Sequence, residues 1–172
     1  MSAFILLIVL AGTTNLAFPQ GTQKSQPVQL EEDDWELTRV IQASTGRIRD
    51  LGPKIENTST PPEDKAKYQA EREAAVTNIE TVGQKRPENF KAQMDVGKAL
   101  LKVSEPGRAL PFADQAISLS QGKPRRESAA RTLRGTILQG QGDYPGAAQE
   151  CDRAATLDPS NKAAFSCYQL TR

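Results

Sequence analysis

The sequence predicts an all-α protein, and two observations support that fold class. Apolar residues recur at helical spacing in several segments of the chain, and turns rich in proline and glycine separate these segments. The part expected to be ordered, about 140 residues, is near the usual size of one domain. We therefore expect about seven helices, no sheet and a single domain over residues 31–172.

The N-terminus has the pattern of a secretory signal peptide over residues 1–21. The apolar run 3–11 is shorter than the roughly 20 residues that a membrane-spanning helix needs, and small and polar residues follow it. Cleavage is expected after Ala17 or Gly21, so the protein is predicted to be exported, periplasmic or secreted, with no stable membrane span. No Lys or Arg precedes the run. The alternative is an apolar N-terminal strand or helix packed on the domain.

Residues 22–30 continue a segment rich in Gln, Ser, Thr and Pro, which predicts a flexible tether. An acidic stretch at 31–36 then favours a helix N-terminus, and this helix is expected to run to about Arg49. Residues 51–62 contain Gly-Pro and Pro-Pro pairs and predict a break before a second helix over 64–84. The apolar positions expected along the first helix are Trp35, Leu37, Val40, Ile41 and Ile48.

Residues 128–161 predict a helical hairpin. The helix over 129–140 ends at Gly140 and Gly142, because glycine tolerates the left-handed conformation that closes a helix, and Asp143 can cap the next one. Small side chains on the second helix face Gly135 on the first, which lets the two backbones approach closely. A turn at 158–161 then supplies the cap for a partial helix over 162–172. The small side chains of the second helix are Ala147, Cys151, Ala154 and Ala155.

This hairpin resembles a tetratricopeptide repeat. The same pattern of residues recurs upstream at a constant offset. The offset equals one repeat of about 34 residues plus an insertion, which is expected at 123–126. The resemblance implies a short right-handed α-solenoid with repeats at 90–123 and 128–161 and a degenerate repeat before 87. Such repeats stack because one helix pair cannot bury its apolar face alone. The residues that carry the repeat pattern are Gly97, Ala109, Ala116, Gly135, Leu138, Gly142, Tyr144, Ala147, Ala154 and Pro159.

The chain also departs from the family pattern. Gln93 and Arg131 stand where a bulky aromatic residue is common, and Val96 and Arg134 replace a leucine, so a thin core is expected. Pro111 falls inside the second helix of the middle repeat. An interior proline costs roughly 3 kcal/mol, so this helix is expected either to start near residues 108–110 or to be kinked.

The resemblance places the first helix of each pair on the concave side, where partners bind. Residues 85–134 hold eleven basic and five acidic side chains, a net charge of +6, which would suit an acidic protein or peptide partner. The alternative is that these lysines form an ordinary solvated face. Nucleic acid is not expected, because the basic residues lack interleaved aromatic residues. The candidate partner-binding residues are Lys91, Met94, Lys98 and Lys102, followed by Thr132, Thr136 and Gln139 in the next repeat.

Cys151 and Cys167 lie on helices that the repeat geometry packs side by side. A disulfide would tie the last helix to the domain, and closing a loop of this size contributes about 3 kcal/mol in the chain-entropy model. The alternative is two small thiols that fill a narrow helix interface.

The sequence gives little support to catalysis. The chain contains no histidine, which is the commonest general base, and no phosphate-binding glycine motif, so no cofactor, metal or catalytic residue is predicted. The resemblance implies a non-catalytic adaptor that holds a peptide or helix of an envelope or secreted partner. The first alternative is a structural subunit that self-associates through Phe165, Tyr168 and Leu170 of the last helix. The remote alternative is an unrecognised enzyme.

Overall fold

A computed structural model describes residues 30–170, and within them the side chains of 35–167 and 169. The signal peptide and almost all of the tether predicted from the sequence lie outside this range. The described part is all-α and contains no strand, as predicted. Its seven helices are α1 (Leu30–Glu56), α2 (Pro62–Lys85), α3 (Phe90–Lys102), α4 (Pro106–Leu119), α5 (Pro124–Gly140), α6 (Tyr144–Leu157) and α7 (Lys162–Leu170).

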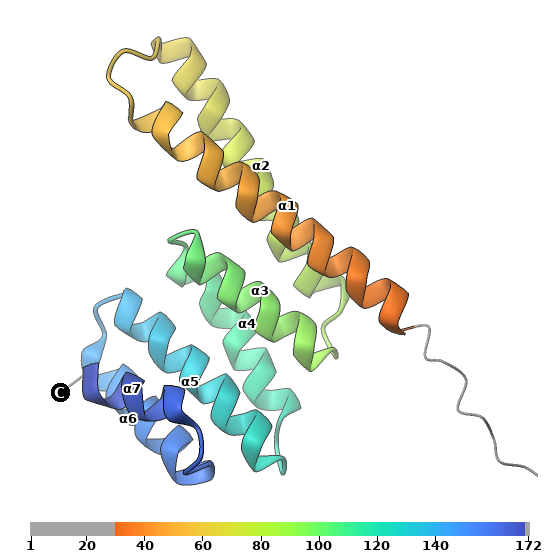
Figure 1. Cartoon of the computed structure of the whole chain (residues 1–172), viewed down its shortest axis with the longest axis vertical. Helices are drawn as coiled ribbons and strands as arrows, with labels where there is room; N and C mark the ends of the chain where they lie inside the picture. The colour runs from red at the N-terminus through yellow and green to blue at the C-terminus, as the bar shows by residue number, and fades with distance from the viewer. Residues whose placement is uncertain (1–29, 171–172) are drawn as a thin grey trace, which may run out of the picture.

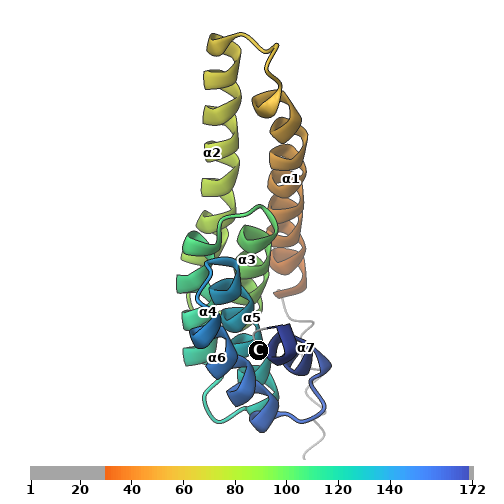
Figure 2. The ribbon, with the colours of Figure 1, turned by 90° about the vertical axis from the view of Figure 1, so that its left-hand side faces the viewer.

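The helices pack sequentially in adjacent pairs, and the pairs stack into two layers. Each helix contacts the next in the chain, and α1, α3, α5 and α7 also contact one another in series. Figure 1 shows these four helices in front of α2, α4 and α6, and the view turned by 90° in Figure 2 separates the two layers. We call the layer of α1, α3, α5 and α7 the odd-helix face. The even helices cover its other side.

The first helix is longer than the sequence suggested, because α1 continues through Gly52 and Pro53 to Glu56. The break predicted to begin at residue 51 is therefore wrong in its position. Leu51 is fully buried, so its packing stabilises the last turns of α1, while Pro53 is exposed. A proline inside a helix leaves one backbone carbonyl of the preceding turn without an amide donor. On the solvent side water can donate to that carbonyl, so the proline destabilises the helix less than it would in the core.

Two of the expected apolar positions of α1 do not reach the core. Trp35 is 60% exposed and Val40 is 41% exposed, whereas Ile48 is buried. The start of α1 extends past the end of α3 in Figure 1, whereas Leu37 and Ile41 further along pack against the core. Trp35 instead carries the guanidinium of Arg39 over its ring, 5.0 Å from the centroid.

The helix α4 starts at Pro106 and contains Pro111, so of the two alternatives for this helix, a later start or a kink, the later start is wrong. Pro111 is exposed, and the carbonyl it leaves without an amide partner belongs to Gly107, which is also exposed. Water can replace the missing hydrogen bond at this position.

The insertion expected between residues 90–123 and 128–161 is one additional helical turn. Helix α3 ends at Lys102 and α5 ends at the equivalent position of the next helix pair, Gly140, but α5 has 17 residues and α3 has 13. The additional residues form the first turn of α5, residues 124–127. A whole turn adds length without rotating the apolar face of the helix, which keeps the following pair in register.

The turns that follow α3 and α5 share one geometry. The amide of Glu105 donates to Leu100 O and that of Asp143 donates to Leu138 O, both at 2.9 Å. Both turns require a residue in the left-handed region, which is Gly142 (φ 83°) in one and Ser104 (φ 64°) in the other. Glycine adopts this conformation at no steric cost, and serine does not.

We therefore expect Ser104→Gly to raise the free energy of unfolding by about 1 kcal/mol, since it relieves this local strain. The reciprocal change Gly142→Ser should lower it by a similar amount. Urea unfolding followed by circular dichroism measures both values. Equal and small effects of the two substitutions would show that Ser104 is not strained.

Candidate functional site

The odd-helix face holds two neighbouring hollows. The first, which we call the α1–α3 hollow, has a volume of about 420 Å³. Four cations and one carboxylate line it, and the cations are Arg49 from α1 and Lys91, Lys98 and Lys102 from α3. Its α1 wall also includes Thr38, Ile41, Gln42 and Thr45.

The second hollow, the α3–α5–α7 hollow, has a volume of about 330 Å³. Its walls are mainly apolar and come from three odd helices and the turn before α7. Lys98 lines this hollow as well as the first, so the two lie on either side of one lysine. The residues that close it from the α7 side are Asn161 and Ala163.

The structure brings most of the predicted partner-binding residues to these hollows. Lys91, Lys98 and Lys102 line the first, and Met94, Thr132 and Thr136 line the second. Met94 and Thr132 are only 5% and 9% exposed, so they form the floor and offer little surface. Gln139 lines neither hollow.

The α1 wall was missed because α1 lies outside the recognisable repeats. Thr38, Gln42, Thr45 and Arg49 follow one another at spacings of four, three and four residues, which places them on one helical face. This polar stripe was visible in the sequence. No repeat motif linked it to α3, however, so its neighbour could not be inferred.

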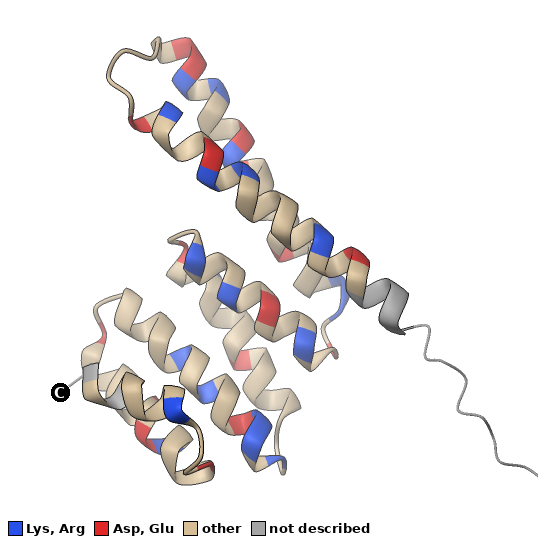
Figure 3. Cartoon of the chain, viewed as in Figure 1, with Lys and Arg blue, Asp and Glu red and all other residues tan. Residues whose placement is uncertain are grey.

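Of the cations that line the two hollows, Lys98 and Lys102 carry the unbalanced charge. Both are exposed, and neither forms an ion pair with a residue in the described part of the chain. Lys91 differs, because its Nζ lies 2.7 Å from the carboxylate of Asp95 one turn later. Within the two hollows the free positive charge therefore lies on Lys98, which lines both, and on Lys102, which lines the first. Figure 3 shows the basic positions along α3.

The two arginines that replace apolar residues of the family pattern are anchored away from this charge. Arg131 and Arg134 both reach the carboxylate of Glu150, at 2.9 and 3.3 Å, and the Glu150 side chain is only 8% exposed. Burial alone would lower the pKa of Arg131, but its hydrogen bonds to Glu127 and Glu150 outweigh this and raise it. Both arginines thus tie α5 to α6, and neither supplies free charge to the hollows.

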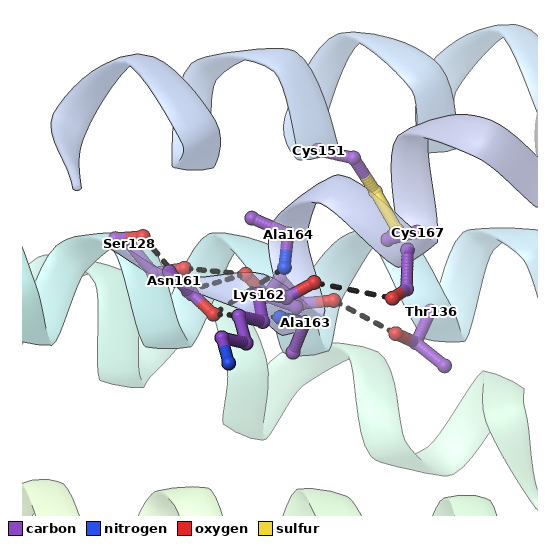
Figure 4. The surroundings of a disulfide bond; sticks show 10 residues. Ser128, Thr136, Cys151, Asn161, Lys162, Ala163, Ala164 and Cys167 are labelled. Carbon is purple, nitrogen blue, oxygen red and sulfur yellow. Dashed lines mark hydrogen bonds between the residues drawn. A yellow bond between two sulfur atoms is a disulfide. The ribbon is translucent and has the colours of Figure 1, made fainter. Parts of the chain in front are cut away.

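The helix α7 is fixed in place at both of its ends (Figure 4). Asn161 Nδ2 donates to the hydroxyls of Ser128, at 2.9 Å, and Thr132, at 3.1 Å, while Oδ1 accepts from the amides of Ala163 and Ala164. Toward its other end, Cys167 is joined by a disulfide to Cys151 of α6. Because α7 closes the α3–α5–α7 hollow, these contacts also shape that hollow.

Within the described residues, no group of three or more Cys, Asp or Glu side chains is arranged to hold a metal ion. None of the helices described is long and apolar enough to cross a bilayer. By its fold and these hollows the chain is an all-α protein of helices packed in adjacent pairs, with two hollows on one layer. No family model matches the chain, and no curated protein matches it.

Proposed function

We propose that this protein is a non-catalytic adaptor of the tetratricopeptide type, which holds an acidic peptide or helix of another protein on its odd-helix face. The observation that carries the proposal is the pair of unneutralised lysines, Lys98 and Lys102, beside an apolar hollow. An amphipathic acidic segment could place carboxylates against the lysines and an apolar side chain in the α3–α5–α7 hollow.

The helix pairs support the family part of this proposal. The two better repeats share their turn hydrogen bonds and are related by one constant sequence offset, and the small residues of the repeat pattern lie between helices. Ala109, Ala116, Ala147 and Ala154 are fully buried. Tyr144 is 53% exposed and contributes little to packing. A right-handed solenoid is the arrangement that such repeats adopt when they stack.

Export is proposed from the apolar run at 3–11 together with the disulfide. Disulfides persist mainly in oxidising compartments, so a bridge between Cys151 and Cys167 supports a periplasmic or secreted location. The envelope or the extracellular space is then where the partner would be found.

A second candidate function is self-assembly through the last helix. Phe165 of α7 is 46% exposed, at the end of the stack where no further helix of the described chain covers it. A second copy could extend the stack at this end. Light scattering of concentrated protein, compared with Phe165→Ser, tests this alternative.

The adaptor proposal is tested by site-specific crosslinking in cells. A photo-crosslinking residue at Thr136, in the α3–α5–α7 hollow, should capture a partner that the same residue at the exposed Asp152 of α6 does not capture. The purified partner should then bind Lys98→Glu/Lys102→Glu about tenfold or more weakly, because like charges replace opposite ones. Isothermal titration calorimetry measures that ratio.

The matched control is Lys65→Glu/Lys67→Glu on α2, which changes the net charge equally but lies away from both hollows. Its affinity should stay within about twofold of the unchanged protein. Equal losses in the two variants, or equal crosslinking at both positions, would contradict the proposal. Recovery of only a second copy would favour self-assembly.

A further inference from the structure

A third hollow lies at the turns between the helix pairs, on a different part of the molecule from the α3–α5–α7 hollow. We call it the turn hollow. Its volume is about 780 Å³, and its wall comes from the end of α2, the start of α3 and the α4–α5 turn. The first two segments are consecutive in the sequence, and the α4–α5 turn follows them only after α3 and α4. Five cations line it with a single carboxylate, that of Glu88, and the cations are Lys85, Arg86, Lys91, Lys123 and Arg126.

Three of these cations have no internal counterion. Lys85, Lys123 and Arg126 are exposed and form no ion pair with any residue that the structure describes. Figure 3 shows Lys and Arg gathered at the α2–α3 and α4–α5 turns. Like charges held near one another repel, and a multivalent anion between them removes that repulsion. The turn hollow thus has the electrostatics of an anion site.

The chemistry of the wall narrows the class of anion. Guanidinium and ammonium groups together suit phosphate oxygens, which accept several charge-assisted hydrogen bonds at once. Phe90 and Leu119 add a small apolar surface to the wall. The guanidinium of Arg126 lies over the ring of Phe90, 5.5 Å from its centroid, so that face of the ring is not open for a nucleobase to stack on.

We infer that the turn hollow binds a phosphate-bearing anion with more than one negative charge or with several phosphates presented together. Either a soluble oligophosphate or the headgroups of an anionic lipid surface offers this chemistry. The site is separate from the α3–α5–α7 hollow, and Lys91 alone is shared with the α1–α3 hollow. Binding here requires no partner protein on the odd-helix face.

The test uses the whole mature chain with two probes: sodium tripolyphosphate, and vesicles of phosphatidylglycerol in phosphatidylcholine. The site variant is Lys85→Glu/Lys123→Glu/Arg126→Glu. The matched control is Lys65→Glu/Lys67→Glu/Lys162→Glu, which reverses three exposed or partly exposed cations outside the turn hollow. Circular dichroism and the midpoint of thermal unfolding establish that both variants fold.

We expect saturable binding to at least one probe, reduced about tenfold or more in the site variant and within about twofold of normal in the control. Tripolyphosphate binding identifies a soluble ligand, and binding to the anionic vesicles alone identifies lipid headgroups. Absence of binding to both probes at low salt would overturn the inference. So would an equal loss in the two variants, which would reflect net charge alone.

Discussion

Gly135→Ala is expected to lower the free energy of unfolding by about 2 kcal/mol through crowding, although alanine is the better helix former. A Cβ atom at this position would lie 2.5 Å from Cys151 Sγ, 3.1 Å from Cys167 Sγ and 3.2 Å from the carbonyl oxygen of Ala147. None of these atoms is the far end of a flexible side chain. Crowding of this kind costs about 1–3 kcal/mol and exceeds the gain of about 1 kcal/mol in helix propensity.

Two other glycines provide a graded control. At Gly97 the nearest atom to a Cβ would be the end of the Leu133 side chain at 3.0 Å, which can rotate, and at Gly46 nothing lies within 4 Å. Gly97→Ala should therefore change stability little, and Gly46→Ala should raise it by about 1 kcal/mol. Chemical denaturation of the three variants measures the series. If Gly135→Ala were as stable as Gly97→Ala, the close approach of α5 to α6 and α7 would not be required.

The close approach at Gly135 and the turn at Gly142 could be predicted from sequence, because each depends on a local property of glycine. The alanines and Cys151 opposite Gly135 recur at helical spacing, and this spacing also predicted that the two helices approach closely there. Where a signal was local and periodic, the helix that it predicted is present at nearly the predicted residues.

Tertiary contacts decide what the sequence could not indicate. Gln93 stands where the family pattern favours an aromatic residue, yet it is 2% exposed. Its Nε2 donates to the carbonyls of Gly83 and Arg86, at 2.8 and 2.9 Å, and so closes the end of α2. A polar residue at a position expected to be apolar thus joins neighbouring helices, and no periodicity within its own helix indicates partners in the preceding one.

The candidate site, like the fold, could be predicted from sequence only where the signal was local. The lysines of α3 and the threonines of α5 followed from the repeat pattern, and so did the helix cap within the turn at 158–161, where Asn161 Oδ1 accepts from the amides of Ala163 and Ala164. The α1 wall and the contacts of Asn161 with α5 did not. Asn161 acts through the hydroxyls of Ser128 and Thr132, 33 and 29 residues earlier. No local rule relates such positions.

The second large effect is expected from the disulfide. Reduction of the Cys151–Cys167 bridge should lower the free energy needed to open α7 locally by about 3 kcal/mol. The reason is that the bridge closes a loop with a sequence separation of 16 residues. Hydrogen exchange at the amides of Ala164 and Cys167 should become about 100-fold faster, while the amides of Leu100 and Ile137 in the core keep their protection. Native-state exchange with and without a phosphine reductant measures both sets.

The outcome also bears on the α3–α5–α7 hollow, since α7 contributes one of its walls. If α7 opens alone, a ligand seated in that hollow should bind the reduced protein more weakly, while phosphate binding at the turn hollow stays unchanged. Uniform loss of protection in every helix would instead mean that the bridge stabilises the whole stack. No change at α7 would mean that Asn161 and the buried Ala164 suffice to hold it.

The two effects are coupled, because the atoms nearest to a Cβ at position 135 are the sulfurs of the bridge. In a Cys151→Ala/Cys167→Ala background those sulfurs are gone, and only the carbonyl of Ala147 at 3.2 Å still opposes the new methyl group. The cost of Gly135→Ala should fall by about 1 kcal/mol in that background. A double-mutant cycle measures this difference. Strict additivity would mean that the backbone of α6, rather than the disulfide, makes glycine necessary at this position.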